Sequence, residues 1–341
     1  MHPFEDRHHR RGIGADRCDE TPVRLDSATT IAAAVPHLLG FHPHESLVFL
    51  WLRRGELVVV QRADLPPPTQ SDEFVDAYFQ PAKSIPADEA IAIVVNQNRD
   101  DHKALWAALE ERCPVRLRAH LHLAGGQIRD RGDTCDSSGG PWTWISTEHR
   151  QLAGSLGIGP TPGQPALSRD RVQAEFDYRP RSSADRIGTG RRFDIADLAQ
   201  MLVIRPLRPS IDVLFDNADD PHGRDLVMWC CARMSQRERR ELLQCMVSAV
   251  AATASGHGAN LAVATAVVAW LSGDGVRANV ALERCLADDP RHLLGRLVDD
   301  ALSTGVPPSA VEAMFTDVPV EVLELPEGVV DEVFVGRYSP A

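Results

Sequence analysis

The sequence lacks the short motifs by which many catalytic sites are recognised. It contains no GxSxG, no HExxH, no P-loop and no GxGxxG that follows a strand. The glycine-rich stretch "GSLGIGPTPG", residues 154–163, does not stand between a strand and a helix, so we do not interpret it as a phosphate-binding loop. These absences favour a non-catalytic role without deciding whether the chain is an enzyme.

Long hydrophobic runs are absent as well. No apolar stretch approaches the ~20 residues that a membrane-spanning helix needs. Residues 1–20 have mixed charge and no hydrophobic core, which excludes a secretory signal and predicts a mobile leader. We therefore expect a cytoplasmic protein without a membrane partner.

The chain also lacks an excess of positive charge and lacks paired cysteines. Its formal net charge is −12, and such a polyanion is poorly suited to hold a phosphate backbone, so we do not expect a nucleic acid partner. The seven cysteines are odd in number and form no CxxC pair, which is typical of a reduced, cytoplasmic chain. The length of 341 residues and the apolar content of 43% suffice for two globular domains.

Patterns in the first half predict an α/β domain over residues 21–168, with a mixed sheet and flanking helices. We predict strands over residues 22–26, 46–52, 57–64, 89–97 and 115–124, and helices over residues 28–39, 71–82 and 99–113. The tight turn "RRGE" makes the second and third strands a hairpin, hence the mixed sheet. The last strand alternates apolar and polar residues and is expected to have one solvated face. Residues 125–168 show few periodic signals and are expected to be a loop-rich segment.

The second half predicts an all-α domain over residues 193–317, because apolar residues recur at three- and four-residue spacing without a strand pair. A basic linker, residues 169–192, precedes it, and a tail, residues 318–341, follows it. Residues 258–302 divide into three helices at "SGDG" and "DDP". Small residues at 278 and 285 match the spacing of a tetratricopeptide repeat, so we predict a helical hairpin of that type.

The stretch "IAAAVPHLLGFHPHESLVFLWL", residues 31–52, joins an apolar helix to an apolar strand. Pro36 predicts a kink or a break, because it removes a backbone donor inside the helix. Gly40 is placed as the left-handed residue that ends the helix, Phe41 folds back onto the last turn, and Pro43 prevents continuation. We interpret these four residues as a structural signature.

With "VVVQRADLP" and the downstream "AWLSGDGVRANVALERCLADDP", this signature resembles the actinobacterial domain-of-unknown-function family 4192. The resemblance covers nearly the whole chain, and its most specific parts are the helix–Gly-Phe-x-Pro–strand signature and the GDG-x₂-A segment. Relatives often carry several cysteines after the fifth strand, where this chain has only "GDTCDSSGG". The resemblance implies the fold and an actinobacterial host, and it implies no reaction.

Three histidines of the signature, His37, His42 and His44, are candidate metal ligands because neutral imidazoles at this spacing can converge on one ion. Only Glu45 is available to complete the set, however, and structural metal sites need four ligands. We therefore interpret the histidines mainly as residues of an exposed turn.

A candidate ligand site lies where the strands end, since sheets flanked by helices bind ligands there. Arg62 and Asp64 end one strand, and Asn96 and Gln97 end another, so these side chains can line one crevice. The alternative is an ordinary surface ion pair between Arg62 and Asp64 beside strand-end turn residues.

The better metal candidate combines Cys113, His120, His122 and Cys135. The two histidines are two residues apart on a predicted strand, so both rings point to the same face. Two sulfurs and two nitrogens suit tetrahedral zinc. The alternative is a solvated strand face near two unrelated thiols.

Arginines are concentrated in residues 168–192 of this acidic chain and can contact an acidic partner or a phosphate, namely Arg179, Arg181, Arg186, Arg191 and Arg192. The alternative is a solvated linker. The leading functional hypothesis is a non-catalytic interaction or regulatory module with a protein partner. The second hypothesis is an enzyme or a small-ligand or nucleotide-binding protein whose pocket lies at the strand ends of the α/β domain.

Overall fold

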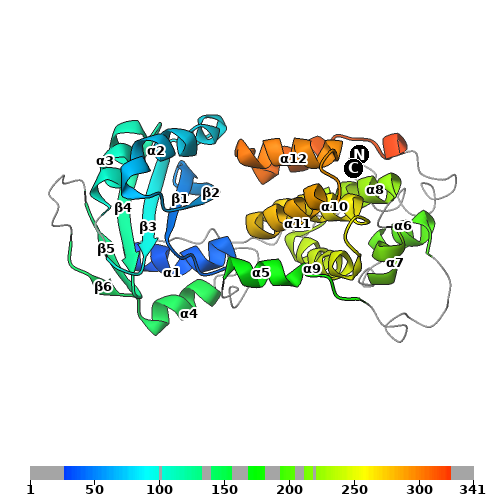
Figure 1. Cartoon of the computed structure of the whole chain (residues 1–341), viewed down its shortest axis with the longest axis horizontal. Coiled ribbons are helices and arrows are strands. Elements are labelled where there is room, and N and C mark those ends of the chain that lie inside the picture. Colours follow the sequence, from blue (N-terminus) through cyan, green and yellow to red (C-terminus); the bar gives the residue numbers. More distant parts are fainter. Residues whose placement is uncertain are drawn as a thin grey trace, which may run out of the picture.

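The computed structural model of the chain describes residues 27–99, 102–132, 140–155, 168–180, 193–203, 211–217 and 220–323. Two parts lie side by side in it, an α/β part up to residue 155 and a helical part from residue 168 onward (Figure 1). The predicted leader and the predicted strand over residues 22–26 lie outside the described residues.

Six strands form one mixed sheet in the order β2-β1-β3-β4-β5-β6. Their bounds are β1 (Ser46–Arg53), β2 (Glu56–Asp64), β3 (Glu89–Asn96), β4 (Arg116–Ala124), β5 (Gln127–Asp130) and β6 (Thr143–Trp144). Neighbouring strands are antiparallel except for β3 and β4, which are parallel. Ser46 pairs with Asp64 on one side and with Val95 on the other. The start of β1 and the ends of β2, β3 and β4 therefore share one edge, the carboxyl edge of the sheet.

Helices cover both faces of the sheet. On one face α1 (Ala28–Leu39) and α4 (Thr147–Ser155) pack through Val35 and Ala153 onto Ile93 and its neighbours. On the other face α2 (Ser71–Phe79) and α3 (Lys103–Arg112) pack through Phe79 and Leu105, with the short 3₁₀ turns η1 (Pro68–Gln70) and η2 (Pro81–Ser84) beside them. Burial on both faces explains why β1 and β3 are almost continuously apolar.

The turn from α1 into β1 has the predicted geometry. The Ser27 hydroxyl accepts a hydrogen bond from the Thr30 N–H at 3.1 Å and caps the helix. Gly40 is left-handed, with φ +77°, and its N–H donates to the His37 carbonyl at 3.2 Å. Of the predicted kink or break at Pro36, the break is wrong, because α1 continues to Leu39, and the kink stays a prediction. The single donor lost at Pro36 is outweighed by the packing of the helix on the core.

Residues 125–168, predicted as a loop-rich segment, contain three short elements that the sequence did not indicate: β5, β6 and α4. These elements are short and mostly polar, so their apolar periodicity is weak. The expected solvated face of β4 is also wrong, since His120 and His122 are buried. Only its first half, with Arg116 and Arg118, alternates between exposed and covered positions.

The helical part surrounds a central helix, α10, whose residues 261–271 are all buried. Its elements are α5 (Arg169–Glu175), α6 (Ile195–Val203), α7 (Ile211–Asp216), α8 (Pro221–Ala232), α9 (Gln236–Ala252), α10 (Ala259–Leu271), α11 (Gly275–Asp288), α12 (Leu293–Ser303), α13 (Pro308–Thr316) and the 3₁₀ turn η3 (Val320–Leu323). The three helices predicted within residues 258–302 are confirmed, and Asp274 caps α11. Val172 and Phe176, which begin the predicted linker, belong to the same core.

None of the helices in the described residues combines the length and apolarity that a membrane crossing needs. None of the five described cysteines, Cys113, Cys230, Cys231, Cys245 and Cys285, forms a disulfide bond. Burial raises the pKa of Cys231 and of Cys285 to about 12, so these thiols stay protonated near neutral pH.

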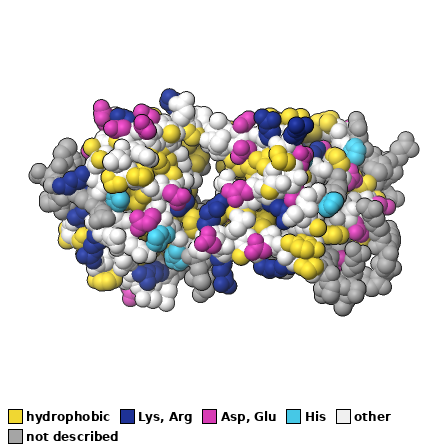
Figure 2. All heavy atoms as spheres, in the orientation of Figure 1, with side chains coloured by type: hydrophobic (Ala, Val, Ile, Leu, Met, Phe, Trp, Pro, Cys, Tyr) yellow, Lys and Arg dark blue, Asp and Glu magenta, His cyan; other side chains and the backbone are white. Residues whose placement is uncertain are grey.

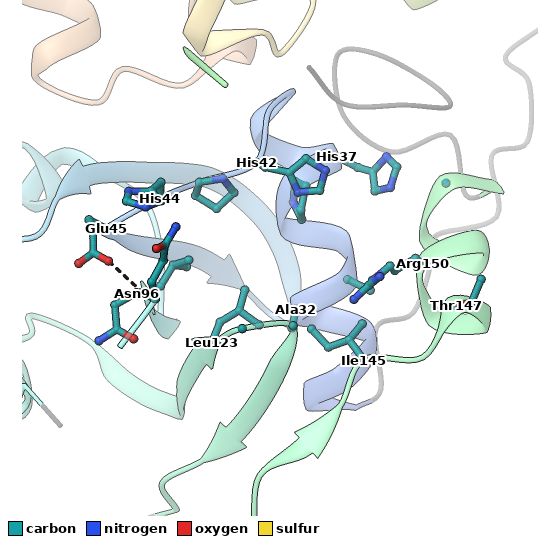
Figure 3. A pocket seen from close by; sticks show the side chains of 18 of the residues that line it. Ala32, His37, His42, His44, Glu45, Asn96, Leu123, Ile145, Thr147 and Arg150 are labelled. Atoms are coloured by element: carbon teal, nitrogen blue, oxygen red, sulfur yellow. Dashed lines mark hydrogen bonds between the residues drawn. The ribbon is translucent and has the colours of Figure 1, made fainter. Parts of the chain in front are cut away.

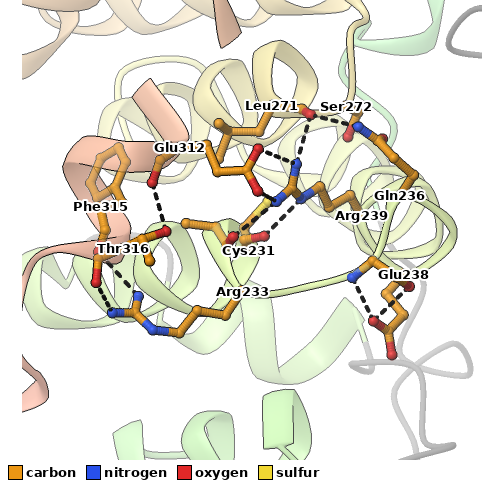
Figure 4. Close-up of polar contacts among 12 residues, drawn as sticks. Cys231, Arg233, Gln236, Glu238, Arg239, Leu271, Ser272, Glu312, Phe315 and Thr316 are labelled. Atoms are coloured by element: carbon orange, nitrogen blue, oxygen red, sulfur yellow. Dashed lines mark hydrogen bonds and ion pairs between the residues drawn. The ribbon is translucent and has the colours of Figure 1, made fainter. Parts of the chain in front are cut away.

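A buried arginine joins four helices of the helical part (Figure 4). Arg239 of α9 is 3% exposed and donates to the carbonyls of Cys231, Ala232 and Leu271 at 2.9–3.2 Å. Its guanidinium also forms an ion pair with Glu312 of α13 at 2.7 Å. All three nitrogens of the guanidinium are therefore engaged, which is how a buried charge is stabilised.

Few contacts join the two parts of the molecule. The Ser84 hydroxyl donates to the Thr304 carbonyl at 2.7 Å, and Val276 of α11 packs against the α1 side of the sheet. A hollow separates the parts elsewhere (Figure 2), and a cavity of about 640 Å³ lies between the β1–β2 hairpin and α13. Each part therefore has its own core, as expected for two domains that share a small contact.

Candidate functional site

A cavity of about 800 Å³ lies at the carboxyl edge of the sheet. It is lined by α1, the loop from His42 to Glu45, the ends of β3 and β4, the turn between β4 and β5, and α4. We call it the sheet-edge cavity. Ligands of α/β proteins bind at this edge because strand ends leave polar groups and loops beyond the packed layers. Its volume lies within the usual range of small-molecule sites.

The loop between α1 and β1 forms one wall of this cavity. Gly40 reverses the chain, and Glu45 follows with a positive φ of +41°, a conformation that is uncommon outside glycine and asparagine. The Glu45 carboxylate accepts the Gln97 N–H at 2.9 Å, and the Glu45 carbonyl accepts the Leu65 N–H at 2.8 Å. These bonds hold the carboxylate of Glu45 at the cavity wall.

Charged groups of opposite sign lie at two ends of the sheet-edge cavity. Figure 3 shows Glu45 at one end, Arg150 of α4 at the other, and the side chains of Ala32, Leu123 and Ile145 between them. The guanidinium of Arg150 makes no hydrogen bond or ion pair with any residue that the structure describes. An apolar floor between a carboxylate and a guanidinium can bind a molecule that is polar at both ends.

Three histidines line the same cavity. His37, His42 and His44 lie along one side of it in Figure 3, between the two charged ends. Burial lowers the pKa of His37, and the neighbouring His42 lowers it further. Partial burial, and then the charge of Arg150, lower the pKa of His42. Both imidazoles are therefore neutral near pH 7 and offer one donor and one acceptor each.

Asn96 connects the cavity to two further histidines. Its amide nitrogen lies 2.8 Å from Nε2 of His102, and its amide oxygen lies 3.0 Å from Nε2 of His122. Because the amide nitrogen can only donate, His102 accepts there and His122 donates. Asn96 lines the sheet-edge cavity, but these two bonds occupy much of its side chain, and its predicted role in ligand binding stays a prediction. Its role is to position the end of β3.

Arg62 and Asp64 are not among the residues that line this cavity. They form an ion pair with each other, and the Asp64 side chain is 83% exposed. Arg62 also donates to the Ser46 hydroxyl at 2.9 Å and lies 6.0 Å from the ring centroid of Phe41. These contacts tie the end of β2 to the α1–β1 turn, beside the cavity rather than inside it.

The residues of the predicted zinc site are only partly within the described chain. His120 and His122 point to the same face of β4, as predicted, and α3 covers that face. Burial raises the pKa of Cys113 to about 11, and His122 Nε2 is engaged with Asn96. No group of three or more His, Cys, Asp or Glu side chains within the described ranges is placed to hold a metal ion. Cys135 lies outside those ranges, so the four-ligand site stays a prediction.

Of the five predicted partner-binding arginines, only Arg179 is described. Its N–H donates to the Ala251 carbonyl and its guanidinium to the Ala174 carbonyl, both at 2.7 Å. Arg179 therefore anchors the end of α5 to α9. Arg181, Arg186, Arg191 and Arg192 lie outside the described residues.

Sequence reasoning missed the α4 side of the cavity, including Thr147 and Arg150. A signal was present, because Ser146 precedes α4 as a helix cap and its hydroxyl accepts the His149 N–H at 3.2 Å. The sequence "STEH" has the serine and first-turn acid of a helix start. The Gly125-Gly126 pair, with φ values of +54° and +77°, similarly marks the turn between β4 and β5.

Comparison with known proteins identifies the family but not the chemistry of the cavity. No curated protein and no solved structure matches the chain. A family model described as a domain of unknown function, DUF4192, matches residues 29–200 and 199–309. These matches include α1, the α1–β1 turn, both strands of the parallel pair and α4. The chain therefore belongs to the family described as domain of unknown function DUF4192.

Proposed function

We propose that the chain binds a small organic molecule in the sheet-edge cavity. The observation that carries the proposal is the pairing of an apolar floor with charged and imidazole side chains that project around it, in a cavity of about 800 Å³. A stability role alone does not account for these groups, because polar side chains that stabilise a fold are normally bonded within it. Glu45 is held in an uncommon backbone conformation at the same place.

The proposal agrees with a non-catalytic, regulatory role, in which the bound molecule is sensed rather than converted. Protein interaction, an actinobacterial origin, a cytoplasmic location and the tetratricopeptide type of the α10–α11 pair stay predictions from the sequence. The two parts make few contacts, so a ligand that binds one part has room to alter their relative position.

Thermal-shift screening with amino acids, nucleotides and sugar phosphates tests this proposal, with isothermal titration of each hit. The variant Gln151→Trp places a large ring on the α4 side of the cavity, at an exposed position where folding tolerates it. The matched control is Leu152→Trp, which adds a ring at the next position, where the side chain is 48% exposed and does not line the cavity.

We expect at least one ligand class to raise the melting temperature, and Gln151→Trp to abolish that shift while Leu152→Trp preserves it. If every hit stabilises the wild type and Gln151→Trp equally, binding occurs elsewhere and the proposal fails. It also fails if no compound stabilises the wild-type protein at millimolar concentration.

A further inference from the structure

We infer that the sheet-edge cavity binds a guanine mononucleotide, with its phosphate at Arg150 and the donor edge of its base at Glu45. This inference rests on the proposed function and names its ligand class. Three features carry it: a guanidinium without a bonded partner among the described residues at one end, a fixed carboxylate at the other, and a floor and side wall suited to a flat ring between them.

The anionic group of the ligand belongs at Arg150. The guanidinium has no ion-pair partner within the described chain, although it faces a cavity. Gly126 lies directly beneath it, since a Cβ atom there would stand 3.2 Å from Nη2 of Arg150. The absence of a side chain at Gly126 therefore leaves the guanidinium room at the turn. A planar guanidinium binds a phosphate with two parallel hydrogen bonds, and the Thr147 hydroxyl lines the same end of the cavity.

The other end of the ligand must donate hydrogen bonds. An ionised carboxylate only accepts them, and the Gln97 N–H fixes one oxygen of Glu45 while leaving acceptor capacity on both. Among the common nucleobases, guanine presents a ring N–H and an adjacent amino group on one edge. These two parallel donors match the two oxygens of a carboxylate. Adenine has no ring N–H on the corresponding edge, so guanine fits better.

The centre of the cavity suits the ring and the sugar. Ala32, Leu123 and Ile145 form the apolar floor, and imidazoles line one side. Histidine rings are among the side chains on which nucleobases stack. Neutral imidazoles, as the lowered pKa values of His37 and His42 indicate, stack without adding charge beside the base. The volume of about 800 Å³ accommodates a mononucleotide.

Titration calorimetry with three probes tests the inference: GMP, guanosine, which lacks the phosphate, and IMP, which lacks the amino group. Each is titrated into wild-type protein, into Glu45→Gln, which preserves side-chain size, and into Arg150→Gln, which removes the guanidinium but keeps a polar side chain. Arg116→Gln and Glu148→Gln are the controls, because neither residue lines the cavity. Melting curves without ligand confirm that every variant is folded.

We expect GMP to bind wild type about 10- to 100-fold more tightly than guanosine, since a charge-assisted contact is lost. Arg150→Gln should remove this difference, and Glu45→Gln should remove the preference for GMP over IMP. The controls should behave as wild type. The loss of affinity on removing the phosphate from the ligand and the loss caused by Arg150→Gln should not add, because both changes remove the same contact. The same should hold for the amino group of the base and Glu45→Gln.

Equal binding of GMP and guanosine, or a phosphate effect that survives in Arg150→Gln, overturns the inference. If GMP does not bind but another metabolite does so in a manner sensitive to Gln151→Trp, the proposed function stands and the nucleotide assignment fails. If no compound of the screen binds, both fail.

Discussion

The charged side chains at the sheet-edge cavity and the buried charges of the helical part differ in their surroundings. In the helical part, buried and partly buried charges are bonded within the chain: Arg239 contacts three carbonyls and Glu312, and Arg277 donates to both oxygens of Glu175 at 2.8 Å. In the α/β part, Glu45 and Arg150 face a cavity instead. Fully bonded polar networks stabilise a fold, whereas polar groups around a cavity are available to a ligand. The difference is consistent with our proposal that the α/β part binds a ligand, while the charges of the helical part stabilise its fold.

The network at the start of α11 shows the same use of charge. Asp274 is 1% exposed, caps the helix, and forms an ion pair with Arg277 at 2.6 Å. Burial raises the pKa of Asp274, while Arg277 acts to lower it. Through Glu175, the network also fixes α5 to α11, so the segment that follows the α/β part is anchored in the helical core.

The strongest test of this difference is whether the buried Arg239 is needed for the stability of the helical part. Arg239→Ala removes the donors of three carbonyls and leaves Glu312 without its ion pair, so we expect the free energy of unfolding to fall by about 3–5 kcal/mol. Urea denaturation followed by circular dichroism measures the loss. The control Arg237→Ala, on the same helix but 89% exposed, should cost less than about 0.5 kcal/mol. Equal losses in both variants would contradict this assignment.

A second variant tests whether the hydrogen bonds of Asn96 with His102 and His122 stabilise the α/β part. Asn96→Ala removes the acceptor of the buried His122 N–H and the donor to His102, so we expect a loss of about 1–3 kcal/mol. The neighbouring variant Gln97→Ala, at an exposed side chain, should change stability by less than about 0.5 kcal/mol. Denaturant titration of both proteins measures these changes in the free energy of unfolding. An unchanged free energy of unfolding in Asn96→Ala would show that this network does not stabilise β3.

Variants in the α1–β1 turn separate residues that stabilise the fold from residues that only line the cavity. Gly40→Val places a branched side chain at φ +77° and should lower stability by about 1 kcal/mol or more, seen as a lower melting temperature. Gly40→Asn should cost less, because asparagine tolerates this conformation better. His42→Ala and His44→Ala should leave the melting temperature nearly unchanged. A stable Gly40→Val together with unstable histidine variants would reverse our interpretation of the turn.

The smallest expected effect is a pH dependence that involves His37. Burial holds its pKa in the folded protein below the ordinary value of 6.5. As the pH falls through 6.5, the unfolded chain therefore binds the proton first, so the contribution of His37 to stability is complete above this pH and is lost below it. Wild type should lose more stability than His37→Gln between pH 7.5 and pH 5.5, measured by urea denaturation. Parallel losses in the two proteins would show that His37 does not contribute.

Several elements were predictable because their signals are local. Ser27 and Gly40 bracket α1, and "RRGE" gives the β1–β2 hairpin, since caps and tight turns depend on a few adjacent residues. Continuous apolar runs likewise identified β1 and β3. The short β5, β6 and α4 were missed because packing onto the sheet, rather than their own periodicity, determines them.

The residues of the candidate site could be predicted only in part from local sequence patterns. Strand ends predicted Asn96 but also Arg62 and Asp64, and the register places that pair beside the cavity rather than in it. Glu45 and Arg150 line the same cavity although they are 105 residues apart in the sequence. No local sequence pattern predicts that two such distant residues lie at one site.

The sequence by itself determined the family signature, the division into an α/β half and a helical half, and the geometry of the α1–β1 turn. Each depends on periodicity or on backbone preferences of adjacent residues. Only the tertiary structure decided that His120 and His122 are buried beneath α3, and that Glu45 and Arg150 face one cavity. These outcomes depend on sheet order and on which helix covers which face, and long-range packing sets both.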